Sequence, residues 1–328
     1  MAYQRAMIKM VMTPNTPALE ERFTQPDGFE WRSFTRQSAH GARDIRVGLF
    51  AANKAVATVV ILPGLSEFGE KYFEICRNLN AQRINVFVID WFGQGKSGRY
   101  LEIPHKRHSY SFDEDLRDLD MMMNTFITPD NNTPLVMLGH SMGGNIGLRY
   151  LDQHPDIFKA AAFSAPFLGL RTAHMLPRFI TKAILATMNK IAPRQYGPGQ
   201  SRWRLELREN YGSNIFSSDP IRDRLHNHWC ETEPKLQQGG VTWGWIYAAM
   251  QSCFAIERAA PSIKTPTLMG KAEKDEVVDN HAIDNVAQMM GAQVMELNGA
   301  RHEIFMEQDT IRQPFLDAVL DHIKTHIR

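Results

Sequence analysis

A short apolar segment that ends in a glycine-framed serine constrains this chain more than any other part of its sequence. Residues 134–138 (PLVML) run directly into Gly139-His140-Ser141-Met142-Gly143. An apolar run of this length that stops at glycine predicts a buried strand. The G-x-S-x-G at its end predicts a sharp turn from strand into helix, with the serine at the apex and glycines where side chains would collide. The pattern predicts that Ser141 is an activated alcohol in a hydrolase or an acyl transferase.

Apolar runs alternate with helical patterns along the first half of the chain and again near its end. This rhythm predicts an α/β fold with a mostly parallel central sheet flanked by helices. Residues 28–36 and 43–50 alternate apolar and polar side chains, which predicts a hairpin. Further strands are expected at 55–62, 84–89, 135–138, 160–163, 266–269 and 293–297, and helices at 70–82, 112–127, 145–151 and 313–327, the last with Pro314 in its first turn.

The rhythm is interrupted between residues 167 and 245. This stretch has helical patterns, no clear strand, and four of the six tryptophans, namely Trp203, Trp229, Trp243 and Trp245. Its aromatic content favours a folded element over a solvated linker. We therefore expect a core formed by residues 1–166 and 246–328, with residues 167–245 inserted as a helical cap.

Composition excludes several classes of protein. A formal net charge of +1 implies no polyanionic partner, so nucleic acid is not expected. Three cysteines, Cys76, Cys230 and Cys253, argue against a disulfide framework and favour a reducing compartment. No apolar run approaches the roughly 20 residues that span a bilayer. We expect a cytoplasmic protein with no cofactor and no metal, since His226-x-His228-x-Cys230 lacks the spacing of a standard zinc site.

A serine hydroxyl needs a base that takes its proton and an acid that orients the base. His302 lies between the last expected strand and the last expected helix, and it is the candidate base. The acid is expected in the loop after strand 266–269. Asp275 is preferred there, because Val277-Val278 returns to the core just beyond it, and Glu276 and Asp279 stay as alternatives.

Two backbone amides should stabilise the negative oxygen that forms when the serine attacks a carbonyl group. Met142, the residue after the nucleophile, is expected to supply one. The loop Pro63-Gly64-Leu65-Ser66, after strand 55–62, is expected to supply the other, with Leu65 as the preferred donor.

Together these pieces resemble the α/β-hydrolase superfamily, and within it the bacterial lysophospholipase L2 and monoacylglycerol lipase group. The matching stretches are Pro63-Gly64 with Glu67 and Tyr72, Asp90-x-x-Gly93-Gln94-Gly95-x-Ser97-Gly98, Gly139-His140-Ser141-Met142-Gly143-Gly144, Ser164-Ala165-Pro166, Gly239-Gly240-Val241-Thr242, Asp275-Glu276-Val277-Val278-Asp279 and Gly299-Ala300-x-His302-Glu303. Many relatives have His-Gly at Pro63-Gly64. They often have His-Arg at Trp91-Phe92, and this difference predicts a more apolar rim beneath the cap.

The resemblance implies the α/β-hydrolase fold and a serine carboxylester hydrolase with Ser141, Asp275 and His302 as its triad. It implies a lysophospholipase or monoacylglycerol lipase that cleaves small monoacyl lipid esters through an acyl-enzyme. The alternative is a broad-specificity short-chain esterase or an acyltransferase on the same fold. A binding protein with a vestigial site is disfavoured, because the serine, the acid and the histidine are all present.

Two further stretches have both a structural and a functional interpretation. Residues 177–188 mix apolar side chains with Arg178 and Lys182. We favour a cap helix packed on the core, and the alternative is transient contact with the inner face of the membrane. The acidic residues between Asp113 and Asp120 are expected to form a solvated helix face.

Overall fold

A central eight-stranded sheet organises the computed structural model, which describes residues 18–127, 132–170, 177–206 and 215–327. The strands are β1 (Phe29–Ser38), β2 (Gly41–Phe50), β3 (Ala57–Leu62), β4 (Ile84–Asp90), β5 (Leu135–His140), β6 (Ala160–Ser164), β7 (Thr267–Ala272) and β8 (Gln293–Leu297). Their order across the sheet is β1-β2-β4-β3-β5-β6-β7-β8. β2 pairs antiparallel with β1 and β4, and all other neighbours are parallel. The predicted mostly parallel sheet is confirmed, and each strand overlaps a predicted segment.

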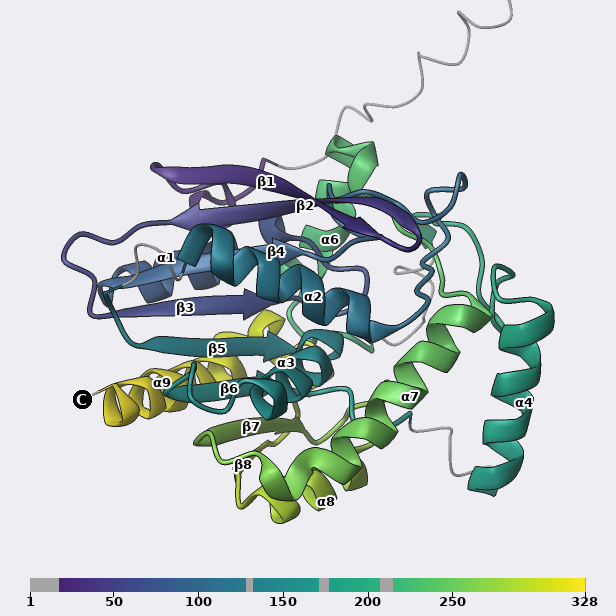
Figure 1. Ribbon diagram of the computed structural model, residues 1–328. Coiled ribbons are helices and arrows are strands. Elements are labelled where there is room, and N and C mark those ends of the chain that lie inside the picture. The colour runs from purple at the N-terminus through teal and green to yellow at the C-terminus, as the bar shows by residue number, and fades with distance from the viewer. Residues whose placement is uncertain (1–17, 128–131, 171–176, 207–214, 328) are drawn as a thin grey trace, which may run out of the picture.

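Helices cover both faces of this sheet (Figure 1). α2 (Phe112–Met122) and α3 (Met142–Gln153) lie in front of the strands, and α1 (Phe73–Asn80) and α9 (Asp309–His326) lie behind them. Strands covered on both sides are apolar throughout, and every residue of β3 and β5 is buried. The parallel strands end on the same edge, so the loops after β3, β5, β7 and β8 meet there.

The helices differ from the predicted ones mainly at their ends. The helix expected at 70–82 begins as a 3-10 turn, η2 (Gly69–Tyr72), and the one expected at 112–127 ends as a π-helical turn, η3 (Met123–Ile127). The prediction that the last helix starts with Pro314 in its first turn is wrong, because α9 starts at Asp309. The Gln308 carbonyl accepts the amides of Ile311 and Arg312 and so begins the helix earlier. Pro314 therefore lies in the second turn of α9, where its missing N–H removes one backbone hydrogen bond of the helix.

Helix α8 (Asn280–Met290) was not predicted from the sequence. Its first turn is capped by Asp279, whose carboxylate accepts the amide of His281 at 3.0 Å. An aspartate is a favoured N-cap residue. The cap gives Asp279 a structural position, which matters below because this residue was an alternative for the catalytic acid.

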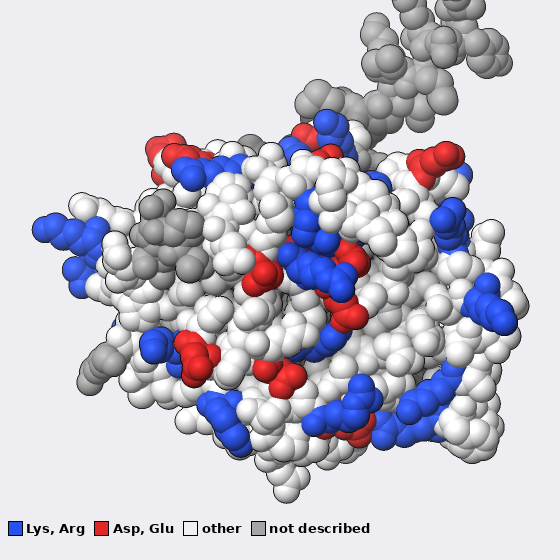
Figure 2. Space-filling view, viewed as in Figure 1, with Lys and Arg blue, Asp and Glu red and all other residues white. Residues whose placement is uncertain are grey.

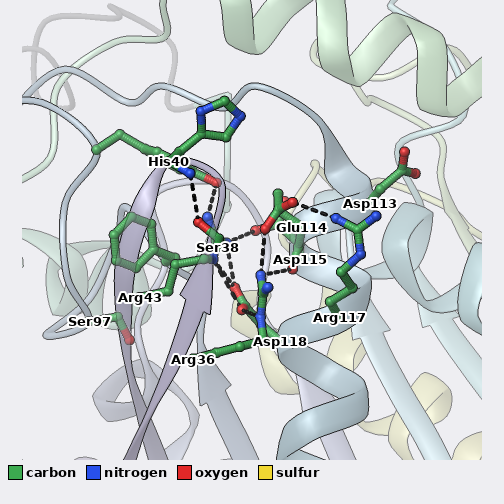
Figure 3. A network of polar contacts seen from close by, with 12 residues as sticks. Arg36, Ser38, His40, Arg43, Ser97, Asp113, Glu114, Asp115, Arg117 and Asp118 are labelled. Atoms are coloured by element: carbon green, nitrogen blue, oxygen red, sulfur yellow. Dashed lines mark hydrogen bonds and ion pairs between the residues drawn. The ribbon is translucent and has the colours of Figure 1, made fainter.

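The acidic residues of α2 do not form the solvated face that we expected. Glu114, Asp115 and Asp118 are buried against the β1–β2 hairpin. There the guanidinium groups of Arg36 and Arg43 meet them, and Arg36 lies 2.7 Å from Asp118 (Figure 3). Burial raises the pKa of Asp115 to about 6 although Arg43 opposes the shift. The prediction fails because the arginines belong to another element, which the helical pattern of α2 does not reveal.

Between β6 and β7 the chain forms a group of helices near the carboxyl ends of the strands, and the last of them runs back beside α3 (Figure 1). These are α4 (Arg178–Ile191), α6 (Pro220–Thr232) and α7 (Trp243–Ala259), with the 3-10 turns η5 (Pro234–Leu236) and η6 (Ala260–Ser262). The segment before α7 is fixed to a core loop by backbone bonds. The Arg107 amide donates to Gly240, and the Arg107 carbonyl accepts the amide of Thr242 at 2.9 Å.

The helix expected at 177–188 is present as α4, and one side of it packs on the protein as we favoured. α4 packs on α7 and buries Leu185. Its outer side chains stay exposed, with Phe179 at 73% and Ile191 at 68%. Lysine and arginine side chains gather along the molecular edge where α4 lies (Figure 2). In the described part of the chain, every helix is too short or too polar to cross a bilayer.

Candidate active site

Ser141 occupies a strained turn between β5 and α3. Its φ of 48° and ψ of −115° lie in a region that residues with a side chain rarely adopt. A Cβ at Gly143 would overlap the carbonyl oxygen of Leu62, and one at Gly139 would lie 2.9 Å from the ring of Phe163. The strained apex and the need for glycine on both sides, predicted from the motif, are therefore present.

Three side chains from three loops form a hydrogen-bonded relay. Nε2 of His302 lies 3.0 Å from Oγ of Ser141, and Nδ1 of the same ring lies 2.8 Å from Oδ2 of Asp275. Ser141 follows β5, Asp275 follows β7 and His302 follows β8, so the common edge of the sheet brings them together. A base in contact with a hydroxyl, itself held by an acid, is the arrangement that activates a serine.

The structure separates the three candidates for the acid. Asp275 contacts the His302 ring through Oδ2, while its Oδ1 accepts the amides of Val277 and Val278 at 2.8 and 2.9 Å. Asp279 caps α8. Glu276 is exposed, and among the described residues no hydrogen bond joins it to the histidine. Asp275 is the carboxylate that lies in place to orient His302.

The charges of the relay oppose the effect of burial. Burial disfavours the charged form of Asp275, but His302 and the two valine amides together hold the pKa of this carboxyl below its usual value. Burial also disfavours the imidazolium form of His302. Asp275 outweighs it, with help from Glu303 and Glu67, so the pKa of His302 is raised. The carboxylates around His302 therefore favour its protonated form.

The loop after β3 lies beside the nucleophile, where the oxyanion is expected. Gly64 is so close that a Cβ there would be 3.2 Å from Cβ of Ser141. The amides of Gly64 and Ser66 donate to Glu67 and Gln94, whereas among the described residues we find no acceptor for the amide of Leu65. Met142 begins α3, so its amide has no acceptor within the helix. Both predicted donors line the cavity that contains Ser141.

That cavity has a volume of about 640 Å³ and mainly apolar walls. Trp203, Trp243 and Trp245, from the segment between β6 and β7, line it together with Phe167 and Leu170. Polar side chains are interspersed, among them His226, Gln238 and, at the exposed rim, Arg204. The cavity is large enough for a small ligand, and Ser141 is part of its wall.

The expected apolar rim from Trp91-Phe92 is wrong. Both side chains are buried, and neither lines the cavity. Trp91 instead donates its indole N–H to the Pro63 carbonyl at 2.8 Å, and Phe92 packs on Tyr100. The Trp91 bond holds the start of the loop after β3, which gives this departure from the family pattern a structural role.

Sequence reasoning missed a buried charged cluster beside the relay. Lys71 lies between Glu67 and Glu303 at 2.8 and 2.9 Å, and Tyr72 donates to Glu67 at 2.6 Å. Charged residues three or four apart near a helix start usually face solvent, so the local pattern gave little signal. Glu303 is 232 residues away from Lys71 in the chain, and only the fold reveals the contact.

The sheet, its flanking helices and the serine turn between β5 and α3 define an α/β-hydrolase. The family model described as serine aminopeptidase, S33, matches residues 53–309, and the chain therefore belongs to this family.

Three relatives illustrate the match. Lysophospholipase L2 of Escherichia coli is 30% identical over 90% of this chain and 89% of its own length. Monoacylglycerol lipase of Mycolicibacterium smegmatis is 24% identical over 82% of this chain and 88% of its own. The crystal structure of Paleococcus ferrophilus monoacylglycerol lipase superposes with a TM-score of 0.68 at 21% identity, over 86% of this chain and 99% of that one. The predicted family resemblance is confirmed.

Proposed function

We propose that the chain is a serine carboxylester hydrolase that acts on monoacyl lipids, as a lysophospholipase or a monoacylglycerol lipase. The relay of Ser141, His302 and Asp275 at a cavity with apolar walls is the observation that carries this proposal. Such walls favour an acyl chain, because each methylene removed from water contributes about 0.8 kcal/mol. The names of the relatives support the same substrate class.

The reaction divides into two transfers. Nε2 of His302 takes the hydroxyl proton of Ser141 as Oγ attacks the ester carbonyl, and Asp275 stabilises the resulting imidazolium. The amides of Leu65 and Met142 bind the oxyanion. His302 then gives its proton to the leaving alcohol, which leaves an acyl group on Ser141. A water molecule, deprotonated by His302, releases the fatty acid and restores the serine.

Residues 167–245 act as the cap in this proposal and provide the wall that faces the acyl chain. Three of their four tryptophans, Trp203, Trp243 and Trp245, line the cavity together with residues of the core loops. We further propose that the outer face of α4 touches a lipid surface transiently. Exposed Phe179, Ile184 and Ile191 could enter the interface while Lys182 and Lys190 meet anionic headgroups.

The experiment that tests the activated serine is labelling with a fluorophosphonate probe, which reacts only with an activated hydroxyl. The wild-type protein should gain one adduct, located on Ser141 by peptide mass. Ser141→Ala should lose both the label and ester hydrolysis. A wild-type protein that stays unlabelled, or an S141A variant that still cleaves esters, would contradict the proposal.

A further inference from the structure

The two halves of the site are joined beneath the cavity by a chain of buried charged side chains. On one side, Glu67 Oε2 accepts the amide of Gly64 at 2.6 Å, and Gly64 begins the loop that carries Leu65. On the other side, Glu303 directly follows His302 in the sequence. Lys71 connects them, since Nζ donates to Glu67 Oε1 at 2.8 Å and to Glu303 Oε2 at 2.9 Å.

This cluster is almost completely removed from water. Lys71 is 1% exposed, Glu67 is 3% exposed and Glu303 is 4% exposed. Burying three charges is costly, and well-packed apolar residues of similar size often stabilise a fold equally well or better. Stability alone is therefore a weak reason for a lysine between two glutamates. Fixing the relative position of two loops gives the cluster a function that apolar residues would not supply.

Further hydrogen bonds hold both ends of the cluster. Glu67 Oε2 also accepts the hydroxyl of Tyr72, and Gln94 Nε2 donates to the carbonyls of Gly64 and Glu67 at 2.7 and 3.0 Å. Glu303 donates its own amide to Phe216 at 2.7 Å. Lys71 therefore joins two braced loops, and a movement of either loop is transmitted to the other.

We propose that Lys71 is a positioning residue that, through Glu67 and Glu303, fixes the oxyanion loop relative to His302. The inference rests on the proposed function, because it assigns the Leu65 amide and His302 to the two sides of one transition state. Lys71 touches neither the substrate nor the reacting atoms. Its effect is on kcat, since the distance between the oxyanion donor and the base matters most when the tetrahedral intermediate forms.

The cluster also sets the electric field at His302. Asp275, Glu303 and Glu67 act on the pKa of this ring, Glu276 and His140 line the same cavity, and Lys71 lies between Glu67 and Glu303. Glu303 and Glu67 favour the imidazolium, whereas the positive charge of Lys71 opposes it. Replacing Glu303 by glutamine should therefore move the acid limb of kcat/KM to lower pH, and replacing Lys71 by methionine should move it to higher pH.

The deciding experiment uses the double variant K71M/E303Q beside K71M, E303Q and K71R in the full chain. The double change keeps the net charge of the cluster, so the two shifts of the acid limb should cancel while the bridge is lost. We expect kcat on a p-nitrophenyl ester to fall about 10- to 100-fold with little change in KM, since removing one oxyanion donor outright costs about 10²- to 10³-fold. K71R, which can still bridge both carboxylates, should recover most of kcat.

Lys271→Met is the matched control. Lys271 also lies between two carboxylates, Asp284 at 3.0 Å and Glu296 at 2.9 Å. Neither of these carboxylates lines the cavity, whereas Glu67 and Glu303 do. A folded K71M/E303Q protein whose kcat stays within twofold of K271M would overturn the inference, as would equal losses in K71R and K71M. If the wild-type protein takes no fluorophosphonate label, it is the proposed function that fails, so the two failures are distinguishable.

Discussion

Asp275→Asn offers a sharp test of the relay, because the change preserves shape and removes one charge. In the wild-type protein, Oδ1 of Asp275 accepts two backbone amides and Oδ2 accepts Nδ1–H of His302. An asparagine that keeps its oxygen toward the amides presents its NH₂ group to the histidine. Nδ1 must then accept a hydrogen bond, so the ring proton moves to Nε2. Nε2 would donate to Ser141 and could no longer take its proton.

The flipped asparagine is no better, because its NH₂ group would face the amides of Val277 and Val278. The first orientation is therefore favoured, and with it the wrong tautomer. An aspartate-to-asparagine change that produces the wrong tautomer lowers kcat by about 10⁴-fold, which corresponds to about 5.4 kcal/mol in the activation barrier. We expect a loss of this size in D275N, with far-UV circular dichroism unchanged.

The assay is release of p-nitrophenol from a soluble ester, with D279N as the control. Asparagine is also a good N-cap residue, so D279N should keep α8 and retain activity within about twofold. A folded D275N variant with less than a tenfold loss would refute the tautomer argument. A loss of about 10⁴-fold in D279N or in Glu276→Gln instead would identify a different acid.

Three further predictions follow from other contacts. Arg43→Met should destabilise the fold by about 3–5 kcal/mol in urea denaturation, because it leaves Asp115 buried without its ion-pair partner and removes one of the two arginines that pair with Asp118. The exposed pair of Arg32 and Glu30 makes R32M the control, at about 0–1 kcal/mol, and equal effects of the two variants would refute the argument. His302 must be neutral to accept a proton, and the carboxylates around it raise its pKa. The acid limb of the pH profile of kcat/KM should therefore have its midpoint above pH 6.5, and a midpoint below pH 6.5 would contradict this prediction. The double variant Phe179→Ser/Ile191→Ser should reduce co-sedimentation with anionic phospholipid vesicles several-fold relative to the wild-type protein. Ile157→Ser, which also changes an exposed apolar side chain, should not. Equal binding by the wild-type protein and both variants would exclude α4 as the contact.

Much of the site was predictable because its residues lie in local patterns. The serine turn follows from the glycines at 139 and 143, whose absent side chains the turn requires. The contacts of Asp275 and His302 with each other and of His302 with Ser141 could be anticipated, because each residue follows a strand of a parallel sheet and such strands end at one edge. The choice of Asp275 over Glu276 and Asp279 was harder, since three carboxylates in one loop differ only in which one the backbone turns toward the ring.

The rest depended on contacts between distant segments. The acidic face of α2 looked solvated because Arg36 and Arg43, which bury it, belong to a hairpin about 75 residues earlier. The cluster of Lys71 and Glu303 escaped notice for the same reason. Trp91 was expected at the rim, whereas its indole N–H bonds to Pro63 in the interior. In each case the sequence contains the residue type, and the partner comes from the tertiary fold.

One comparison decides whether Ser141 makes this chain a hydrolase of monoacyl lipids. It measures fatty acid release from lysophosphatidylcholine, a monoacylglycerol and a short p-nitrophenyl ester, side by side for wild type and S141A. We expect the wild-type protein to cleave at least one of the two monoacyl lipids with a higher kcat/KM than the short ester, and S141A to cleave none of the three. Wild-type protein that cleaves only the short ester, or S141A that still releases fatty acid, would contradict this expectation.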